Sequence, residues 1–268
     1  MTLGGGRGLR IAQALLVKGF AESTAYRAEI VLWMIAGAFP LFMMLIWMSL
    51  AESGPMGGFA AQDFAAYFLV VFFVHEMTQV WVLGQLDEQI RLGEMSSKLL
   101  RPLNPCWEHL ADHLCALAVR LPLLLPFVAL GLFLSGGWGE IEAGRVPLFL
   151  LSLVLAWVIF FSLQYCLGLL AFWTNQAAAF ENLVYTLYLV LGGGVAPLAL
   201  FPELLQRIIG YTPFPYIISL PVEILLMPPD GGAPLSGLMA QLLWAALFVA
   251  LAGFLWRRGL KKYAAFGS

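Results

Sequence analysis

Six runs of mostly apolar residues divide the chain. They cover residues 30–51, 64–83, 113–134, 146–172, 177–200 and 235–256. Each run is long enough for a helix that crosses the bilayer core, which needs about 20 residues. None shows the alternation of apolar and polar residues that is typical of barrel strands. The runs are therefore expected to be helices, in which the backbone N–H and C=O groups bond to each other within lipid. The pattern predicts an all-α polytopic membrane protein with six transmembrane helices.

Composition agrees with this pattern and excludes a soluble domain. Of the 268 residues, 61% are hydrophobic and 11% are charged, whereas soluble chains are about half apolar and about one quarter charged. The formal net charge is -2, so membrane lipid is the expected surrounding and nucleic acid is not an expected partner. Three cysteines are too few for a disulfide framework or a tetrahedral zinc site, and we expect free thiols at Cys106, Cys115 and Cys166.

The distribution of Lys and Arg predicts the orientation. Most of the 14 basic residues lie before the first apolar run, after the second run or after the sixth, and only Arg145 and Arg207 fall on the opposite side. Because basic residues near span ends are retained in the cytoplasm, both termini are predicted to be cytoplasmic. The first run is too long for the apolar region of a cleaved signal. We therefore expect a multi-pass protein of the cell (inner or plasma) membrane.

Residues 1–29 form the first cytoplasmic segment. Charged and polar side chains recur in it among leucines at near-helical spacing. This spacing favours a helix that lies in the membrane interface. An ordinary frayed basic terminus is the alternative.

The longest cytoplasmic connection is the loop 84–112. Its residues 85–100 mix leucine and isoleucine with charged side chains and predict one short amphipathic helix. Arg101-Pro102 and Asn104-Pro105 should prevent its continuation, because a residue before proline is pushed out of the helical region.

Proline and glycine predict irregular backbone on the other side. The extracytoplasmic segment 201–234 is apolar but rich in proline, so we expect it to enter the membrane and return rather than to span it. Gly192-Gly193-Gly194 and Pro197 favour a backbone break near the end of the fifth span. Kinks are predicted at Pro40 in the first span and at Pro122 and Pro126 in the third. Residues 257–268 are expected to be a cytoplasmic tail.

Polar residues within the spans are the candidates for a translocation route. Ionisable groups are costly in a bilayer and suggest function or pairing. Glu76 and Arg120 lie at similar depths, which leaves three interpretations open: a structural ion pair, a water-filled inward cavity, or snorkelling toward the interface. The whole set comprises His75, Glu76, Gln79, Arg120, Glu181 and Asn182.

The sequence carries no catalytic or nucleotide-binding motif. No stretch matches the P-loop pattern GxxxxGK[ST], so this chain is not expected to bind ATP itself. His75, His109 and His113 form no HExxH pair, and no metal site is predicted. We expect neither a catalytic residue nor a cofactor in this chain.

Four short stretches along the chain stand out together. The most specific is Leu-Arg-Pro-Leu-Asn-Pro at residues 100–105. The others are Tyr-Arg-Ala-Glu at 26–29, Ala-Phe-Trp-Thr at 171–174 and Trp-Arg-Arg-Gly-Leu-Lys-Lys-Tyr at 256–263. With them the chain resembles the membrane subunit of an ABC type-2 exporter, with the fold of type V exporters. The resemblance implies a single transmembrane domain over residues 1–268, without catalytic activity of its own.

The same resemblance implies partners. A half-transporter of this kind pairs with a second permease chain, identical or a sibling, and docks two cytoplasmic ATPase subunits that hold ATP and Mg. Its coupling helix would map to residues 85–100. The implied ATPase contacts are Glu88, Arg91, Glu94, Ser97, Lys98 and Arg101, with a second contact at Asn175 and Gln176.

Three functions remain open at this point. The first is an ATP-driven export permease for a hydrophobic, amphipathic or cationic small molecule or a lipid. The second is an ion-coupled secondary carrier that uses Glu76, Glu181 and His75 as proton sites. The third is a membrane enzyme or assembly factor that transports nothing.

Overall fold

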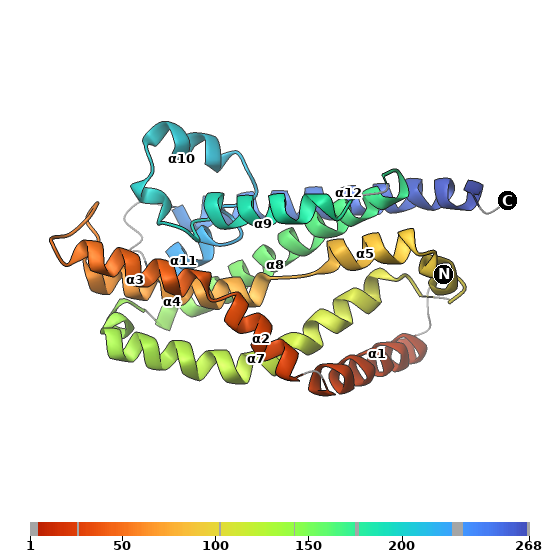
Figure 1. Cartoon of the computed structure of the whole chain (residues 1–268), viewed down its shortest axis with the longest axis horizontal. Helices are drawn as coiled ribbons and strands as arrows, with labels where there is room; N and C mark the ends of the chain where they lie inside the picture. Colours follow the sequence, from red (N-terminus) through yellow and green to blue (C-terminus); the bar gives the residue numbers. More distant parts are fainter. Residues whose placement is uncertain are drawn as a thin grey trace.

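The computed structural model describes residues 5–25, 27–101, 103–141, 143–174, 177–226 and 233–266 (Figure 1). These residues form α-helices joined by turns and short 3-10 segments, and no β-strand occurs among them beyond a single bridge between Met56 and Phe59. Helices α1 to α12 cover, in order, Gly5–Ala25, Arg27–Ala36, Phe39–Ala51, Ala61–Thr78, Val82–Arg91, Glu94–Leu99, Cys106–Ser135, Val146–Leu169, Ala179–Leu191, Glu203–Gly210, Ser219–Leu226 and Ala233–Phe266.

The long helices run roughly along one axis and form an elongated bundle (Figure 1). Both termini, α1 and α5 lie at one end, and the loop after α3 lies at the other with α10 (Figure 1). We call these the terminal end and the far end. Helix α4 is the centre of the bundle, because every residue from Phe64 to Thr78 is buried, whereas the helix pair α2–α3 and α12 are mostly exposed. Its sequence is apolar on all sides, which is the composition of a helix that is surrounded by other helices.

Five helical segments of the described chain are long and apolar enough to cross a membrane. They are Val31–Ala51, Ala61–Arg91, Cys106–Ser135, Ala143–Phe172 and Leu235–Tyr263. A sixth apolar helix, α9, has 13 residues, which corresponds to about 20 Å at 1.5 Å per residue. That is shorter than the roughly 30 Å of a hydrocarbon core, so helix length alone gives five spans.

The first two predicted spans are not continuous helices. The span 30–51 is interrupted at Gly37 and Ala38, between α2 and α3, and Pro40 stands in the first turn of α3. The span 64–83 ends as a helix at Thr78, and the chain resumes at Val82 as α5. In contrast, α7 continues through Pro122 and Pro126 and changes direction along its length (Figure 1).

The predicted amphipathic helix 85–100 is two helices. Helix α5 starts inside the predicted second span, and α6 follows after Leu92 and Gly93. Gly93 adopts a positive φ of 79°, a left-handed conformation that favours glycine and separates the two helices. Helix α6 ends at Leu99, ahead of the two proline pairs, and α7 begins directly after Pro105.

The fifth predicted span, 177–200, was too long. Helix α9 stops at Leu191 because the glycines that follow it form a tight turn, in which Gly193 has a φ of 92°. Beyond this turn the proline-rich segment forms α10 and α11, two separate helices of eight residues each. The predicted tail is a continuation of α12, which remains helical to Phe266.

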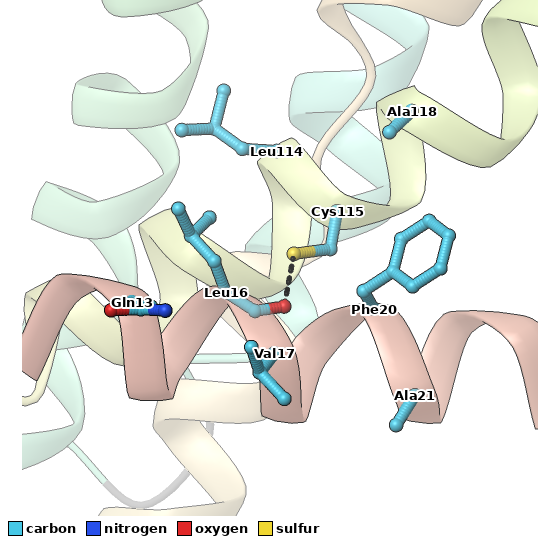
Figure 2. Close-up of a pocket in the computed structure, with 8 residues that line it drawn as sticks. All are labelled: Gln13, Leu16, Val17, Phe20, Ala21, Leu114, Cys115 and Ala118. Carbon is cyan, nitrogen blue, oxygen red and sulfur yellow. Dashed lines mark hydrogen bonds between the residues drawn. The ribbon is translucent and has the colours of Figure 1, made fainter.

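Helix α1 packs along α7. The Cys115 thiol donates a hydrogen bond to the Leu16 carbonyl, with a sulfur–oxygen distance of 3.3 Å. Figure 2 shows this bond at the centre of a largely apolar groove between the two helices, with a volume of about 860 Å³. The groove walls include Leu16, Val17 and Phe20, which remain 44%, 64% and 53% exposed, so α7 covers the apolar residues of α1 only in part.

Candidate functional site

The predicted coupling segment is held to the bundle by a buried carboxylate. Glu108, in the first turn of α7, forms one ion pair with Lys98 Nζ at 3.0 Å and another with Arg101 Nη1 at 2.9 Å. At the next residue of α7, His109 Nδ1 lies 3.1 Å from Gln85 Oε1. These contacts fasten α5, α6 and α7 to one another at the terminal end.

A second tie joins α5 to the start of α9. Asp87 is buried, and its Oδ1 accepts a hydrogen bond from the main-chain nitrogen of Ala177 at 3.0 Å. Arg91 Nε lies 3.8 Å from the other carboxylate oxygen. Ala177 lies directly before Ala178, the N-cap of α9, so the carboxylate fixes the chain that leads into the helix and adds negative charge near the positive end of the helix dipole. Asp87 thus anchors the start of α9 from another helix.

The outer face of this segment is free. The predicted contact residues Glu88, Arg91, Glu94, Ser97 and Arg101 are exposed, although Arg91 and Arg101 also reach the buried carboxylates, and Lys98 turns inward to Glu108.

Two leucines accompany these charges. Leu92 is 57% exposed and Leu100 is 88% exposed. An apolar centre with a polar rim is the usual anatomy of a protein interface. The predicted second contact, Asn175 and Gln176, lies outside the described residues, directly before the tied Ala177.

Deeper in the bundle, polar side chains gather at the two helix breaks. The Glu76 carboxylate lies against Gly37, so close that a Cβ there would collide with it, and His75 Nε2 approaches the same glycine. Both residues are buried, and neither Glu76 Oε1 nor His75 Nε2 has a hydrogen-bond partner among the described residues. Trp33 and Trp81 pack together with ring centroids 5.1 Å apart, so the two breaks are neighbours.

The opposite side of His75 is tied to α9. Its Nδ1 lies 3.2 Å from the hydroxyl of Tyr188, which also lies 2.9 Å from Thr78 Oγ1. Tyr188 stacks on Phe160 of α8, with ring centroids 4.4 Å apart. This buried tyrosine therefore links the end of α4 to both α8 and α9.

Glu76 and Arg120 are neighbours, but their side chains do not form an ion pair within 4.0 Å in the described structure. Instead, Arg120 Nη1 donates to the main-chain carbonyl of Glu76 at 3.3 Å. The reason is that α4 ends at Thr78, which leaves carbonyls in its last turn without helical donors. Arg120 supplies one and places a cation at the negative end of the helix dipole.

Of the remaining predicted residues, Gln79 is buried at the break that follows α4, and the other two lie apart from this cluster. The carboxylate of Glu181, in the first turn of α9, lies 2.9 Å from the position that a Cβ of Gly84 would occupy, next to α5. Asn182 is exposed on α9, and so is Thr186 one turn later.

A comparison with protein families identifies the chain. Residues 32–267 match the ABC-2 family transporter protein. The chain belongs to the ABC-2 transporter family. It is therefore a multi-pass membrane protein and a permease subunit of an ABC transporter, a kind of subunit that associates with ABC ATPase subunits and is not catalytic alone. No curated protein matched the sequence.

Three buried anchors of this ABC-2 permease were missed by sequence reasoning: Asp87, Glu108 and Tyr188. Asp87 has one local signal, because it stands four residues before Arg91 on the same helix face. Glu108 has another, because an acidic residue is favoured in the first turn of a helix that follows proline. Tyr188 has none, since its partners come from segments more than one hundred positions away.

Proposed function

We propose that this ABC-2 permease is the membrane half of an ATP-driven exporter, and that α5 and α6 form the surface on which ATPase subunits dock. The observation that carries this proposal is the two-sided construction of the segment. One side exposes charges around Leu92 and Leu100, and the other is tied through Asp87 to α9 and through Glu108 to α7. A docked subunit that moves α5 would therefore also move α9.

Both termini are cytoplasmic in this proposal, and the chain crosses the membrane six times. The arrangement of α8, α9 and α12 supports six crossings. Helix α8 runs from the far end to the terminal end, and α12 runs in the same direction (Figure 1). Helix α9 returns the chain between them and is extended by the turn after Leu191. The basic residues at the terminal end favour a cytoplasmic location for that end.

A second permease chain, identical or a sibling, would complete the translocation route. Helix α9 supports this, because Asn182 and Thr186 are exposed on one face of it, and polar side chains are costly against lipid. Helix pair α2–α3 is the most exposed of the spans. Helix α4 is buried within its own chain, so we assign the contact between chains to α2–α3 and α9. The two ATPase subunits would hold ATP and Mg.

The cargo of the exporter is proposed to be a hydrophobic, amphipathic or cationic small molecule, or a lipid. The apolar surfaces around the exposed face of α9 support an apolar or amphipathic molecule, with Asn182 and Thr186 as polar contacts. An ion-coupled carrier is the second candidate. It is favoured by the unpartnered His75 Nε2 and Glu76 Oε1, although Glu181, at the start of α9, lies against α5 rather than with them.

The test is purification with a partner ABC ATPase, sought first in the neighbouring reading frames, followed by measurement of ATP turnover with and without this chain. Charge reversals Arg91→Glu and Glu94→Lys should lower both copurification and the stimulation of turnover. Arg207→Glu is the control for charge reversal, because Arg207, like Arg91, is an exposed arginine paired with an acidic residue one helical turn away, here Glu203, but lies on α10 at the far end.

Two results would contradict the proposal. Full stimulation in both reversal variants would show that α5 and α6 are not the docking surface. Transport that depends on a proton gradient, in vesicles without any ATPase, would favour the secondary carrier.

A further inference from the structure

A pocket lined by basic residues lies at the terminal end of the bundle, and it belongs to neither of the sites described above. Its volume is about 440 Å³. One wall is Trp173, in the short turn after α8, and the others come from the last part of α12. The lining residues on α12 are Phe254, Leu255, Arg258, Lys261 and Lys262. We call it the basic pocket.

The packing of α12 fixes the shape of this pocket. Gly259 lies against the ring of Phe172, so close that a Cβ there would collide with it. The Phe172 ring is buried, and its centroid lies 6.2 Å from that of Trp256 and 5.8 Å from that of Tyr263. Trp173 follows Phe172 directly and is held at a steep angle to it, with 86° between the ring planes. The buried ring therefore holds Trp173 beside the basic residues of α12.

The lining is positively charged. It carries three cationic side chains, and no acidic residue is among the residues that line it in the described structure. The Arg258 guanidinium lies 5.3 Å from the ring centroid of Phe254, one turn earlier on α12, and this cation–π contact orients it. Neither Arg258 nor Lys261 forms an ion pair within the described part of the chain. An anion in the pocket would supply a counter-charge to both.

An exposed apolar stripe leads along α12 into the basic pocket. Leu247, Leu251 and Phe254 are exposed and recur every three or four residues, so they share one face of the helix. Arg258 and Lys261 continue the same spacing at the end of the helix. Because α12 is long and apolar enough to cross a membrane, this stripe faces acyl chains. A phospholipid has the matching shape, with acyl chains next to a phosphate headgroup.

We propose that the basic pocket binds the headgroup of an anionic phospholipid, whose acyl chains lie along the stripe on α12. The phosphate would lie between Arg258 and Lys261, since a guanidinium donates two parallel hydrogen bonds to phosphate oxygens. Trp173 would contact the region between headgroup and chains, where tryptophan is favoured. This site does not depend on the docking of an ATPase or on the direction of transport.

The test uses the full chain in a mild detergent, in which no charged membrane surface attracts lipids in general. Native mass spectrometry counts the lipids that remain bound when phosphatidylglycerol or phosphatidylcholine is added at the same concentration. Phosphatidylglycerol, which is anionic, should bind roughly tenfold tighter than the zwitterionic phosphatidylcholine, because the lining offers cations and no partner for choline.

Three variants make the test specific to the pocket. Arg258→Gln and Lys261→Gln should each weaken the binding of phosphatidylglycerol about fivefold, which corresponds to about 1 kcal/mol, and leave that of phosphatidylcholine unchanged. Arg257→Gln is the matched control, because Arg257 is an exposed arginine on the same turn of α12 but does not line the pocket. It should leave the binding of both lipids unchanged.

Four results would overturn the proposal. Equal binding of the two lipids would remove the requirement for an anion. An equal loss in Arg257→Gln would mean that the basic end of α12 attracts lipids without a defined site. Competition by glycerol phosphate at the concentration of the lipid would make the pocket a site for soluble phosphates.

The fourth result concerns a protein occupant. The end of α12 also touches the predicted docking segment, where the Tyr263 hydroxyl donates a hydrogen bond to the Gly93 carbonyl at 3.4 Å. If Arg258→Gln and Lys261→Gln lower copurification of the ATPase and leave the binding of phosphatidylglycerol unchanged, the pocket holds an acidic surface of that subunit instead.

Discussion

The tie between Asp87 and Ala177 should decide whether α5 moves α9. In the Asp87→Ala variant, the Ala177 N–H loses its charged acceptor at 3.0 Å and remains buried. A hydrogen bond to a charged group is worth about 1.5–3 kcal/mol. Its loss therefore shifts the balance between tied and untied arrangements by about 10- to 150-fold. We expect a complex that still assembles but loses most of the permease-dependent stimulation of ATP turnover.

The matched control is Asp63→Ala. Asp63 Oδ2 also accepts a main-chain hydrogen bond, from Ala60 at 2.8 Å, but within the first turn of α4 at the far end. Its removal should lower thermal stability by a similar amount and leave the stimulation of turnover unchanged. The Asp87→Asn variant keeps an acceptor oxygen without the charge, so we expect an intermediate loss. ATP turnover of the purified complex, divided by that of the ATPase alone, is the measurement.

Two results would refute this reasoning. If Asp87→Ala keeps full stimulation while its ATPase partners remain bound, α5 does not act on α9 through this bond. If Asp63→Ala loses as much stimulation as Asp87→Ala, the effect is a general loss of stability. Copurification of the ATPase in each variant separates a defect in docking from a defect in coupling.

Three further predictions concern stability in detergent. Arg120→Gln should lower the melting temperature more than Glu76→Gln, because Arg120 binds the main-chain carbonyl of residue 76, and Glu76→Gln leaves that bond intact. A larger loss in Glu76→Gln would instead support a side-chain ion pair. Gly37→Ala should cost about 1–3 kcal/mol through collision with the Glu76 carboxylate, while Gly253→Ala, into open space, should be nearly neutral in the same thermal assay. Burial raises the pKa of Glu223 on α11. Its protonated form therefore stabilises the fold at low pH, and this contribution is lost as pH rises through the raised pKa. Glutamine stays uncharged, so Glu223→Gln should become more stable than the wild type as pH rises. A stability difference that stays constant across pH would contradict this.

The architecture was largely readable from the sequence where composition alone decides structure. The run 146–172 is apolar throughout, and α8 with the short turn after it ends at Phe172 as predicted. The glycines after Leu191 marked a backbone break because only glycine adopts the positive φ found at Gly193 without strain. These features depend on single residues or on continuous runs, which a sequence displays directly.

The break after α4 was not predictable in this way. Residues 79–81 are Gln-Val-Trp and contain neither glycine nor proline, so nothing local stops the helix. The structure supplies tertiary reasons instead. Trp81 packs on Trp33 at the other break, and Arg120 caps the freed carbonyl of Glu76. The similar depths of Glu76 and Arg120 in their predicted spans indicated that the two residues are neighbours. They could not indicate that the acceptor is the main-chain oxygen of Glu76 rather than its carboxylate.

The two neighbouring breaks explain how the proposed coupling could operate without disturbing the centre of the bundle. Helix α4 is surrounded on all sides, so a continuous helix from Ala61 to Arg91 would transmit every movement of the docking surface into the core. The interruption at 79–81 separates α5 from α4. A force on α5 is then carried by its side-chain ties, and the Asp87 carboxylate directs it to α9. Because Tyr188 holds the last turn of α9 to His75 and Thr78, the opposite end of α9, where it begins, should move most.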